Sequence, residues 1–378
     1  MTGMVRRVLV VGGGTAGSVA ALALRQQGVE VVLVEKQTNW TAIGHGITIQ
    51  GNALRAFDMV GIGHEVVATG FPMHGVRMLE ADGTLLQEIH SPPLGGPELP
   101  PVMGSMRPRL QAVLSRHVLA SGVDVRLGTS ITAIHDDCDA DGAVVTFTDG
   151  TTDRFELVVG ADGVHSTVRS LIGIDAVPQR LGMAIWRLEG PRPRGMSGAE
   201  LYYGGPRYKA GYTPTGADRM YAYVIDEDRP VADYAGRPLA HAMAERTEGY
   251  GGLWPEICAS IDESCAMDYR SLDALLLDEP WYRGRVLLIG DAAHACPPML
   301  AQGAAMAAED GVVLAELVAE GHPVEQLLEL FMGRRGSRAS MVVRNSVQLA
   351  RWEIDPATPG ADPAGLMAAS MAELTKSF

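Results

Sequence analysis

Three glycines close to the start of the chain have the spacing of a phosphate-binding turn. Gly12, Gly14 and Gly17 follow an apolar run at residues 8–11 and stand in the order G-x-G-x-x-G. The first glycine allows a tight turn out of a strand, the second lets a pyrophosphate approach the backbone, and the third lets a helix pack closely on the sheet. The free N–H groups and the positive dipole end of that helix then face the phosphates. These residues predict a dinucleotide site.

An acidic residue closes the same unit. A second apolar run at residues 29–34 ends in Glu35, 18 residues after Gly17. At the end of that strand a carboxylate is placed to accept hydrogen bonds from the ribose of an adenosine. The glycines alone are a weak signal, but strand, glycines, helix, strand and terminal acid together favour dinucleotide binding over an ordinary turn. Which dinucleotide binds stays open from these residues alone.

A carboxylate also follows a buried strand in the last third of the chain. The apolar run 286–289 opens into Gly290-Asp291, and open α/β sheets bind ligands beyond the carboxyl ends of their strands. Asp291 is therefore placed to bind sugar-like hydroxyl groups. Gly303 and Ala304 open a helix pattern whose N-terminus would face any nearby anion. A helix start after a proline loop explains the helix but not the aspartate, so we favour a binding role.

Two further residues are ambiguous by themselves. Asp162 follows the apolar run 157–160 and precedes Ser166, an order that suits a ligand at the strand end and equally a helix-capping turn. Arg107 begins a helix pattern at 107–119 and opposes the helix dipole there unless it has an anionic partner. Seen alone, Arg107 is more simply explained as a solvated side chain.

The composition excludes several classes of protein. The 378 residues are 47% apolar and carry a net charge of −14, which disfavours a nucleic-acid surface and an anionic membrane patch. No segment approaches the ~20 apolar residues of a membrane span, and the apolar run after Arg6 and Arg7 is too short for a signal peptide. The cysteines at positions 138, 258, 265 and 296 lack C-x-x-C spacing. We therefore predict reduced thiols, no metal site and a cytoplasmic protein.

The elements that must position these residues form an α/β pattern in separated pieces. Buried-strand and helix runs predict a discontinuous Rossmann-like domain at residues 1–72, 100–176 and 274–340. Segments rich in strand signals at 73–99 and 177–273 predict an inserted β-sheet domain that holds the substrate.

Some stretches between and after these elements show little regular pattern. We expect a loop at 91–104, which is rich in proline and glycine, and an irregular stretch after residue 248. Helices are predicted at 303–320 and 324–353. The segment 341–378 is predicted to hold the end of the second helix and a tail with little structure.

The order of the motifs resembles that of the flavin-dependent aromatic hydroxylases, the single-component FAD monooxygenases with the p-hydroxybenzoate hydroxylase fold. Residues 44–54, with Asn52 in the usual place, resemble their second flavin-contacting segment. Arg107-x-x-Leu110 resembles the helix whose arginine contacts the FAD pyrophosphate, and Asp291 resembles the aspartate that binds the ribityl chain. The resemblance implies an α/β fold with a GxGxxG FAD-binding domain, an inserted β-sheet domain and C-terminal helices.

The resemblance also implies a set of cofactor contacts. Asp162-Gly163 resembles the motif that serves both FAD and the pyridine nucleotide. The cofactor-binding residues implied in this way are Gly12, Gly14, Ala16, Gly17, Glu35, Lys36, Ile47, Arg107, Gln111, Asp162, Asp291, Pro298, Gly303 and Ala304.

The chain departs from the family pattern at two positions. The loop from Pro298 to Gly303 has Ala301 where the family has glycine, and alanine there either adds a methyl group beside the flavin or forbids a left-handed backbone. His45 stands where a small residue is commoner. It could touch the flavin or the substrate, although a structural role in the loop is the simpler explanation.

The activity implied by the resemblance is hydroxylation of an aromatic or heteroaromatic small molecule. NADH or NADPH would reduce FAD, O2 would give a flavin C4a-hydroperoxide, and its distal oxygen would pass to the ring. Alternatives are an epoxidase or Baeyer–Villiger-type oxygenase, an O2-independent flavin reductase and, last, a non-catalytic flavin-binding protein. We expect no nucleic-acid partner and a monomer or homodimer.

Substrate contacts should come from the β-rich insertion. Strand alternation places Arg187 on one face with Met183 and Ile185, and it places Tyr221 with Tyr223. Each of these side chains is individually explained as an ordinary sheet residue, and a catalytic tyrosinate would need a strongly perturbed pKa, since tyrosine normally titrates near ~10. The candidates for the substrate pocket are Arg187, Tyr203 and Tyr221.

Overall fold

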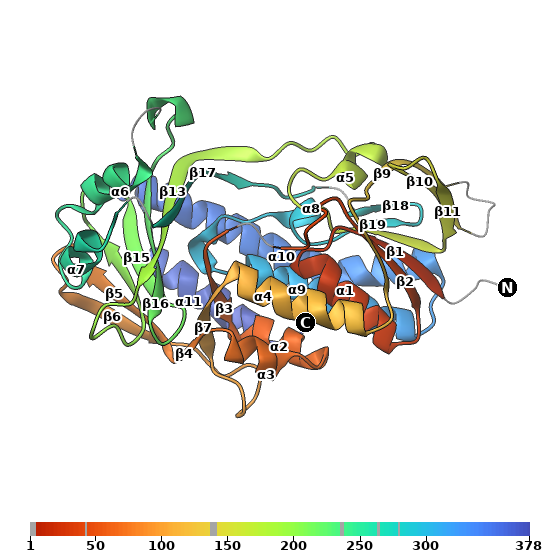
Figure 1. Cartoon of the computed structure of the whole chain (residues 1–378), viewed down its shortest axis with the longest axis horizontal. Helices are drawn as coiled ribbons and strands as arrows, with labels where there is room; N and C mark the ends of the chain where they lie inside the picture. The colour runs from red at the N-terminus through yellow and green to blue at the C-terminus, as the bar shows by residue number, and fades with distance from the viewer. Residues whose placement is uncertain (1–4, 42–43, 137–141, 235–237, 263–264, 279) are drawn as a thin grey trace.

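The computed structural model describes residues 5–41, 44–136, 142–234, 238–262, 265–278 and 280–378. Two large β-sheets lie toward opposite ends of the molecule, and the long helix α10 (Val324–Ile354) extends along the space between them (Figure 1). Cys138, one of the four cysteines considered above, lies outside the described residues.

The first sheet has six strands, and all its pairs are parallel except the edge pair β18–β19. Its central strands are buried on both faces, so their sequences are continuous apolar runs. Helix α1 (Thr15–Gln26) packs tightly on helix α9 (Gly303–Ala319), and a Cβ at Gly311 would lie 2.6 Å from the backbone nitrogen of Ala20. In spatial order the strands are β18 (Tyr282–Arg283), β19 (Val286–Leu288), β12 (Leu157–Gly160), β1 (Arg7–Val11), β2 (Glu30–Glu35) and β8 (Asp124–Leu127).

The second sheet has seven strands and separates two hydrophobic cores. Helices α6 (Leu239–Thr247) and α7 (Trp254–Ala259) pack around Trp186 on one side, and α10 packs near Ile185 on the other. Strand β14 pairs in parallel with β5, which joins the two inserted β-rich segments in one sheet. In spatial order the strands are β17 (Ala266–Ala274), β13 (Gln179–Pro191), β16 (Arg219–Glu227), β15 (Lys209–Pro214), β14 (Ala199–Tyr203), β5 (Gly75–Glu80) and β6 (Leu85–His90).

Two three-stranded sheets and several short helices complete the described fold. One sheet has the order β3 (Gly46–Gln50), β7 (Val102–Met106), β4 (Phe71–Met73), and β3 contacts both β16 and α9. The other has the order β11 (Thr152–Phe155), β10 (Ala143–Phe147), β9 (Ile131–His135). Apart from the C-terminal helix, the remaining elements are α2 (Gly51–Met59), α3 (Gly63–Ala68), α4 (Arg107–Ala120), α5 (Thr167–Leu171), α8 (Asp291–His294) and the 3-10 turns η1 (Val231–Tyr234) and η2 (Pro298–Leu300).

The C-terminal tail differs from the prediction. We expected little structure there, but α11 (Pro363–Leu374) forms a helix of 12 residues. Asp362 caps its start by accepting a hydrogen bond from the N–H of Gly365 at 2.8 Å. Arg338 of α10 donates to the carbonyl groups of its last two residues, which have no partner within the helix. Contacts with α10, which the local sequence does not reveal, therefore stabilise this helix.

The stretch after residue 248 is also more regular than predicted. It contains α7 and the strand β17, which pairs antiparallel with β13. Met267 and Tyr269 of β17 pack against the core around Trp186, whereas Asp268 pairs with arginine side chains on the other face. Residues 267–270 alternate apolar and charged side chains, but Ser271 and Leu272 break this alternation, so the run is too short to indicate a strand. The predicted loop at 91–104 likewise ends in strand β7.

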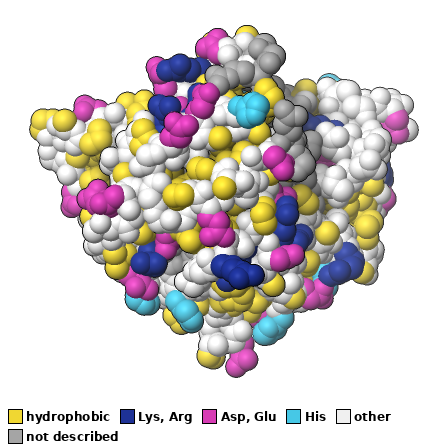
Figure 2. Space-filling view, turned by 60° about the vertical axis from the view of Figure 1, so that its left-hand side comes forward, with side chains coloured by type: hydrophobic (Ala, Val, Ile, Leu, Met, Phe, Trp, Pro, Cys, Tyr) yellow, Lys and Arg dark blue, Asp and Glu magenta, His cyan; other side chains and the backbone are white. Residues whose placement is uncertain are grey.

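The helices and one face of the surface can be compared with those of membrane proteins and of nucleic-acid-binding proteins. Among the described residues, no helix combines the length and apolar character needed to cross a membrane. On the face in Figure 2, lysine and arginine side chains are interspersed with aspartates and glutamates. That face has a field of mixed sign, unlike the basic stripe typical of a nucleic-acid surface.

Candidate active site

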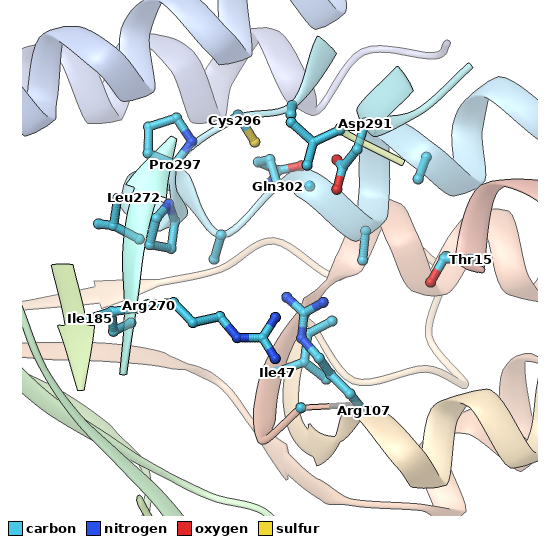
Figure 3. Close-up of a pocket in the computed structure, with 18 of the residues that line it drawn as sticks. Thr15, Ile47, Arg107, Ile185, Arg270, Leu272, Asp291, Cys296, Pro297 and Gln302 are labelled. Atoms are coloured by element: carbon cyan, nitrogen blue, oxygen red, sulfur yellow. The ribbon is translucent and has the colours of Figure 1, made fainter. Parts of the chain in front are cut away.

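A cavity of about 680 Å³ lies where several separated pieces of chain meet. The glycine loop before α1, strand β3, the start of α4, the seven-stranded sheet and the start of α9 all contribute to its wall (Figure 3). The sequence-predicted residues that line it are Gly14, Ala16, Ile47, Arg107, Gln111, Arg187, Tyr221, Asp291, Pro298, Gly303 and Ala304.

The glycine loop is held by four side chains that converge on Gly13. Its N–H donates to the Glu35 carboxylate at 2.8 Å. Its carbonyl accepts from Gln111 at 2.9 Å, from the Trp40 indole at 2.8 Å and from the Ser18 hydroxyl at 3.0 Å. Hydrogen bonds from three separate elements therefore set the loop's conformation. Glu35 supports the loop in this structure, and its binding of ribose stays a prediction.

Asp162 caps a helix in this structure. Its carboxylate accepts hydrogen bonds from the Ser166 hydroxyl at 2.5 Å and from the N–H groups of Thr167 at 2.7 Å and Val168 at 3.1 Å. Of the two explanations that the sequence left open, the capping turn is thus present, while the residues that follow, 163–165, line the cavity. The predicted cofactor residues that are not part of the cavity wall are Gly12, Gly17, Glu35, Lys36 and Asp162.

Two helices present uncapped N-termini to the cavity. Helix α1 begins after Gly14 and α9 begins after Gln302, and neither has a side-chain cap or an acidic residue in its first turn. Their free N–H groups need partners, and their dipoles favour an anion. A Cβ at Gly14 would meet nothing within 4 Å. The loop therefore leaves open space beside the first of these termini.

Arg107 and Asp291 lie on opposite walls of the cavity (Figure 3). Both side chains are accessible inside the cavity although protein surrounds them, and neither has a hydrogen bond or ion pair with another described residue. Burial lowers the pKa of Arg107, and the neighbouring Arg187 adds to this effect. Burial raises the pKa of Asp291, although His294 and Arg107 oppose it. A guanidinium suits a phosphate, and a carboxylate suits hydroxyl groups.

One face of the seven-stranded sheet forms another wall. Ile185 and Arg187 of β13 and Tyr221 and Tyr223 of β16 all line the cavity, on the faces that strand alternation indicated. The two tyrosine rings are stacked with their centroids 5.4 Å apart. A Cβ at Gly46 would lie 2.2 Å from Cγ of Tyr221. Glycine at this position therefore lets β3 approach the tyrosine wall.

The protonation of these tyrosines limits their chemistry. Burial raises the pKa of Tyr221 to about 12, even though Arg187 and Arg107 oppose the shift, and burial also raises the pKa of Tyr223. Both side chains are therefore neutral phenols near pH 7. They can donate hydrogen bonds, whereas a tyrosinate base would need a shift in the opposite direction.

Asp268 organises the charges beside the tyrosines. Arg187 donates to both of its oxygens, from Nε and Nη2, each at 2.8 Å. Nε of Arg270 lies 2.8 Å from Oδ2, and Nδ1 of His45 lies 3.3 Å from Oδ1. Burial lowers the pKa of His45, although Asp268 opposes this. His45 therefore lies beside this ion-pair cluster with a pKa that favours the neutral ring, and it is not part of the cavity wall.

Tyr203 is not part of the cavity wall either. Its ring lies 5.9 Å from Nζ of Lys209, which does line the cavity and pairs with Glu353 of α10 at 2.5 Å. Sequence reasoning missed Lys209 because every residue of β15 is buried, so alternation gives no signal there. It missed Arg270 because β17 was not predicted as a strand.

Ala301 adopts a left-handed backbone, with φ 52° and ψ 37°, and among the described residues no other non-glycine residue has a positive φ. Of the two effects considered from the sequence, alanine therefore does not forbid this conformation here. An L-residue in this region costs about 1–2 kcal/mol relative to glycine.

We expect Ala301→Gly to raise the free energy of unfolding of the apoprotein by about 1 kcal/mol, because glycine adopts a positive φ without steric cost. Denaturant unfolding measures the change. Ala304→Gly, at the second residue of α9, is the matched control and should lower the same free energy by less than about 1 kcal/mol. Equal changes in both variants would contradict the strain at Ala301.

The family is decided by comparison with known proteins. The model of the FAD binding domain family matches residues 6–189 and 270–346. The chain belongs to this family. It is 33% identical over 361 residues to the 2-heptyl-3-hydroxy-4(1H)-quinolone synthase of Pseudomonas aeruginosa, covering 92% of this chain and 90% of the relative. It is 31% identical over 361 residues to the 6-hydroxynicotinate 3-monooxygenase of Pseudomonas fluorescens, covering 90% of each.

A solved structure supports the same relationship. The tetrameric form of 2-methyl-3-hydroxypyridine-5-carboxylic acid oxygenase matches with a TM-score of 0.80 and 27% identity, covering 98% of both chains. The predicted family, the α/β fold and FAD as the cofactor are thereby confirmed, as is the reaction class of an FAD-dependent monooxygenase. Monomer or homodimer stays a prediction for this chain.

Proposed function

We propose that this family member hydroxylates an aromatic or heteroaromatic small molecule with O2, with NADH or NADPH as the electron donor. The observation that supports the proposal is one continuous cavity whose wall combines Arg107, Asp291 and two uncapped helix termini with stacked tyrosines and an arginine. Such a cavity suits a phosphate-bearing cofactor on one side and a planar polar substrate on the other.

The residues present fit FAD. Arg107 and the N-terminus of α1 would hold the pyrophosphate, because both offer N–H donors and positive potential. Asp291 would accept hydrogen bonds from ribityl hydroxyl groups, and the N-terminus of α9 would face an electron-rich edge of the ring system. When bound and reduced by NADH or NADPH, FAD would activate O2, so that one oxygen atom passes to the substrate and the other leaves as water.

The chain's own groups would bind and orient the substrate. Tyr221, a neutral phenol, donates a hydrogen bond, and Arg187 presents a guanidinium that Asp268 holds in place. Ile185 and Leu272 line the same region and exclude water from it. The nicotinamide donor would bind transiently along the cavity, since the chain has only one dinucleotide fingerprint.

We propose a nitrogen heteroaromatic ring with an anionic or carbonyl oxygen as the substrate. The relatives named above are a synthase of a hydroxyquinolone and a 3-monooxygenase of 6-hydroxynicotinate, and the related solved structure is an oxygenase named for a hydroxypyridine carboxylic acid. Arg187, Arg270 and Lys209 at the cavity supply the cationic donors that such an oxygen favours. These relatives give no support to the O2-independent reductase or to a non-catalytic role.

The proposal is tested with the FAD-loaded enzyme and a panel of hydroxypyridine carboxylates, quinolones and phenolic acids. We expect a true substrate to stimulate NADH or NADPH oxidation and to yield a product that carries one atom from isotopically labelled O2. Peroxide release is measured in parallel to separate substrates from ligands that only stimulate oxidation. Turnover undiminished under strict anaerobiosis, or label-free product, would overturn the proposal.

Arg187→Met tests whether the wall of the cavity formed by β13 and β16 binds the substrate. We expect kcat/KM for an acidic substrate to fall about 10–100-fold, because a charge-assisted hydrogen bond is worth about 1.5–3 kcal/mol, while FAD affinity stays close to that of the wild type. Arg180→Met, on the same strand but exposed and paired with Asp228, is the control and should leave kcat/KM unchanged. Equal kcat/KM for Arg187→Met and wild type would exclude Arg187 from substrate binding.

A further inference from the structure

Helix α9 carries two adjacent acids that are completely buried, Glu309 and Asp310. Arg335 of α10 joins them, with Nη1 2.6 Å from Glu309 and Nε 2.7 Å from Asp310. Arg338 donates two further hydrogen bonds to Glu309, at 2.8 and 3.0 Å. A buried ion-pair cluster of this kind is weak evidence for stability by itself, because desolvation offsets much of the attraction. Its contacts toward the cavity indicate a different role.

Glu309 determines how two neighbouring amides are oriented. Nδ2 of Asn52 lies 2.8 Å from Oε1 of Glu309, and because an ionised carboxylate only accepts, the Asn52 atom facing it must be the NH2 group. The same NH2 group lies 2.9 Å from the Gln302 amide, so the Gln302 atom facing it must be the carbonyl oxygen. The NH2 group of Gln302 is therefore turned away from Asn52. The arrangement follows from which atoms of the carboxylate and of the two amides can donate or accept a hydrogen bond.

Gln302 stands at the cavity. It directly precedes α9, lines the cavity and lies on the wall between Cys296 and Asp291 (Figure 3). Its side chain is completely buried, and its Nε2 atom has no hydrogen-bond partner among the described residues. A buried donor without a partner is costly, so an acceptor from outside the chain is expected to satisfy it.

The second acid supports the same wall from its other end. Oδ2 of Asp310 accepts a hydrogen bond from the N–H of Gly290 at 2.9 Å and lies 2.6 Å from Nε2 of His294. Gly290 directly precedes Asp291. Arg335 pairs with both acids. It thereby links the segment of the cavity wall at Gln302 with the segment at Gly290 and Asp291.

We infer that Glu309 is a positioning residue for FAD, acting through Asn52 to turn the Gln302 NH2 group toward an acceptor atom of the bound cofactor. The inference rests on the binding of FAD in this cavity. It concerns residues that lie outside the wall itself, since neither Glu309 nor Asn52 lines the cavity.

A double-mutant cycle on FAD binding tests the inference. In Glu309→Gln the new amide can donate to Asn52, so the orientation of Gln302 is no longer imposed, whereas Gln302→Met removes the amide and keeps the volume. We expect E309Q to weaken FAD binding about tenfold in the wild-type background and less than twofold in the Q302M background. Fluorescence titration of the apoprotein with FAD measures the dissociation constants, and the absorption spectrum of bound flavin should change only where Gln302 is present. Glu316→Gln, on the same helix and paired with Arg334, should change neither.

A second variant keeps the test independent of folding. If E309Q apoprotein does not fold, Asn52→Leu breaks the same relay and leaves Glu309 with all its arginine hydrogen bonds. A tenfold loss in N52L that disappears in N52L/Q302M supports the inference. Losses of equal size in both backgrounds would mean that Glu309 and Asn52 are merely structural and would overturn it. A wild-type protein that binds no FAD would instead overturn the proposed function.

Discussion

Alanine at Gly17 is expected to lower the free energy of unfolding by about 3 kcal/mol and to abolish stable FAD binding. A Cβ there would lie 1.9 Å from the carbonyl oxygen of Gly12 and 3.1 Å from Cγ1 of Val10. Neither the backbone nor the buried strand can yield without moving the loop away from β1. The helix propensity of alanine, worth about 1 kcal/mol over glycine, offsets only part of this cost. Denaturant unfolding of the apoprotein and titration with FAD measure the two effects.

Gly14→Ala separates binding from folding. Gly14 has φ −72°, and a Cβ would meet nothing within 4 Å, so its unfolding free energy should stay within about 0.5 kcal/mol of the wild type. Its Cβ would nevertheless enter the space beside the N-terminus of α1, so FAD affinity should fall. Wild-type stability and FAD affinity in Gly17→Ala would refute the proposed packing of the loop.

Arg107→Met is expected to weaken FAD binding about 100-fold while leaving the apoprotein as stable as the wild type or more stable. The loss corresponds to about 2.7 kcal/mol, within the range for a charge-assisted hydrogen bond to a phosphate. The apoprotein loses nothing because the Arg107 side chain is exposed inside the cavity and makes no hydrogen bond or ion pair with another described residue, while the surrounding protein lowers its pKa. Methionine keeps the apolar stem and removes the charge. A loss of FAD affinity without a loss of stability distinguishes a cofactor ligand from a structural arginine.

Arg116→Met on the same helix is the control for Arg107. Arg116 is exposed and pairs with Glu65, so its removal should change stability by less than about 1 kcal/mol and leave FAD binding unaltered. Thermal unfolding and fluorescence titration are measured on both variants. Equal FAD affinity for Arg107→Met and the wild type would show that Arg107 does not hold the cofactor.

The cofactor side of the site could be predicted because its residues are defined within local elements. Gly14 directly precedes a helix after a strand, Arg107 starts a helix and Asp291 follows a strand. All three line the same cavity although they are far apart in sequence. The carboxyl ends of parallel strands meet at one edge of a sheet, so local patterns were sufficient here. Asp162 shows the limit, since one pattern suited both a ligand and a helix cap.

The substrate side could be predicted only in part because its sheet is covered on both faces. Tyr202 packs in one core, 6.2 Å from the Trp254 ring, while Tyr203 lies beside Lys209. With aromatic and apolar residues on both faces, alternation separates the two sets but does not say which set meets the cavity. The position of Tyr203 was therefore not decided by its own strand.

Ion pairs between side chains far apart in the sequence could not be predicted from the sequence patterns. Glu309 lies in an alanine-rich helix, and its partners Arg335 and Arg338 follow 26 and 29 residues later. Arg338 also binds the end of α11, the helix that we did not predict. Such pairs leave no periodic signal, because a buried charge needs a partner in space and not in the neighbouring turn.

The strand–glycine–helix unit, the positions of Arg107 and Asp291 and the membership of an FAD-binding family could all be inferred from the sequence, because each depends on the order of residues and motifs along the chain. Which face of the seven-stranded sheet meets the cavity, how Asp268 holds its arginines and how Glu309 orients Gln302 became known from the three-dimensional structure. These features depend on which surfaces pack together and where buried charges find partners, and separate segments acquire both only on folding.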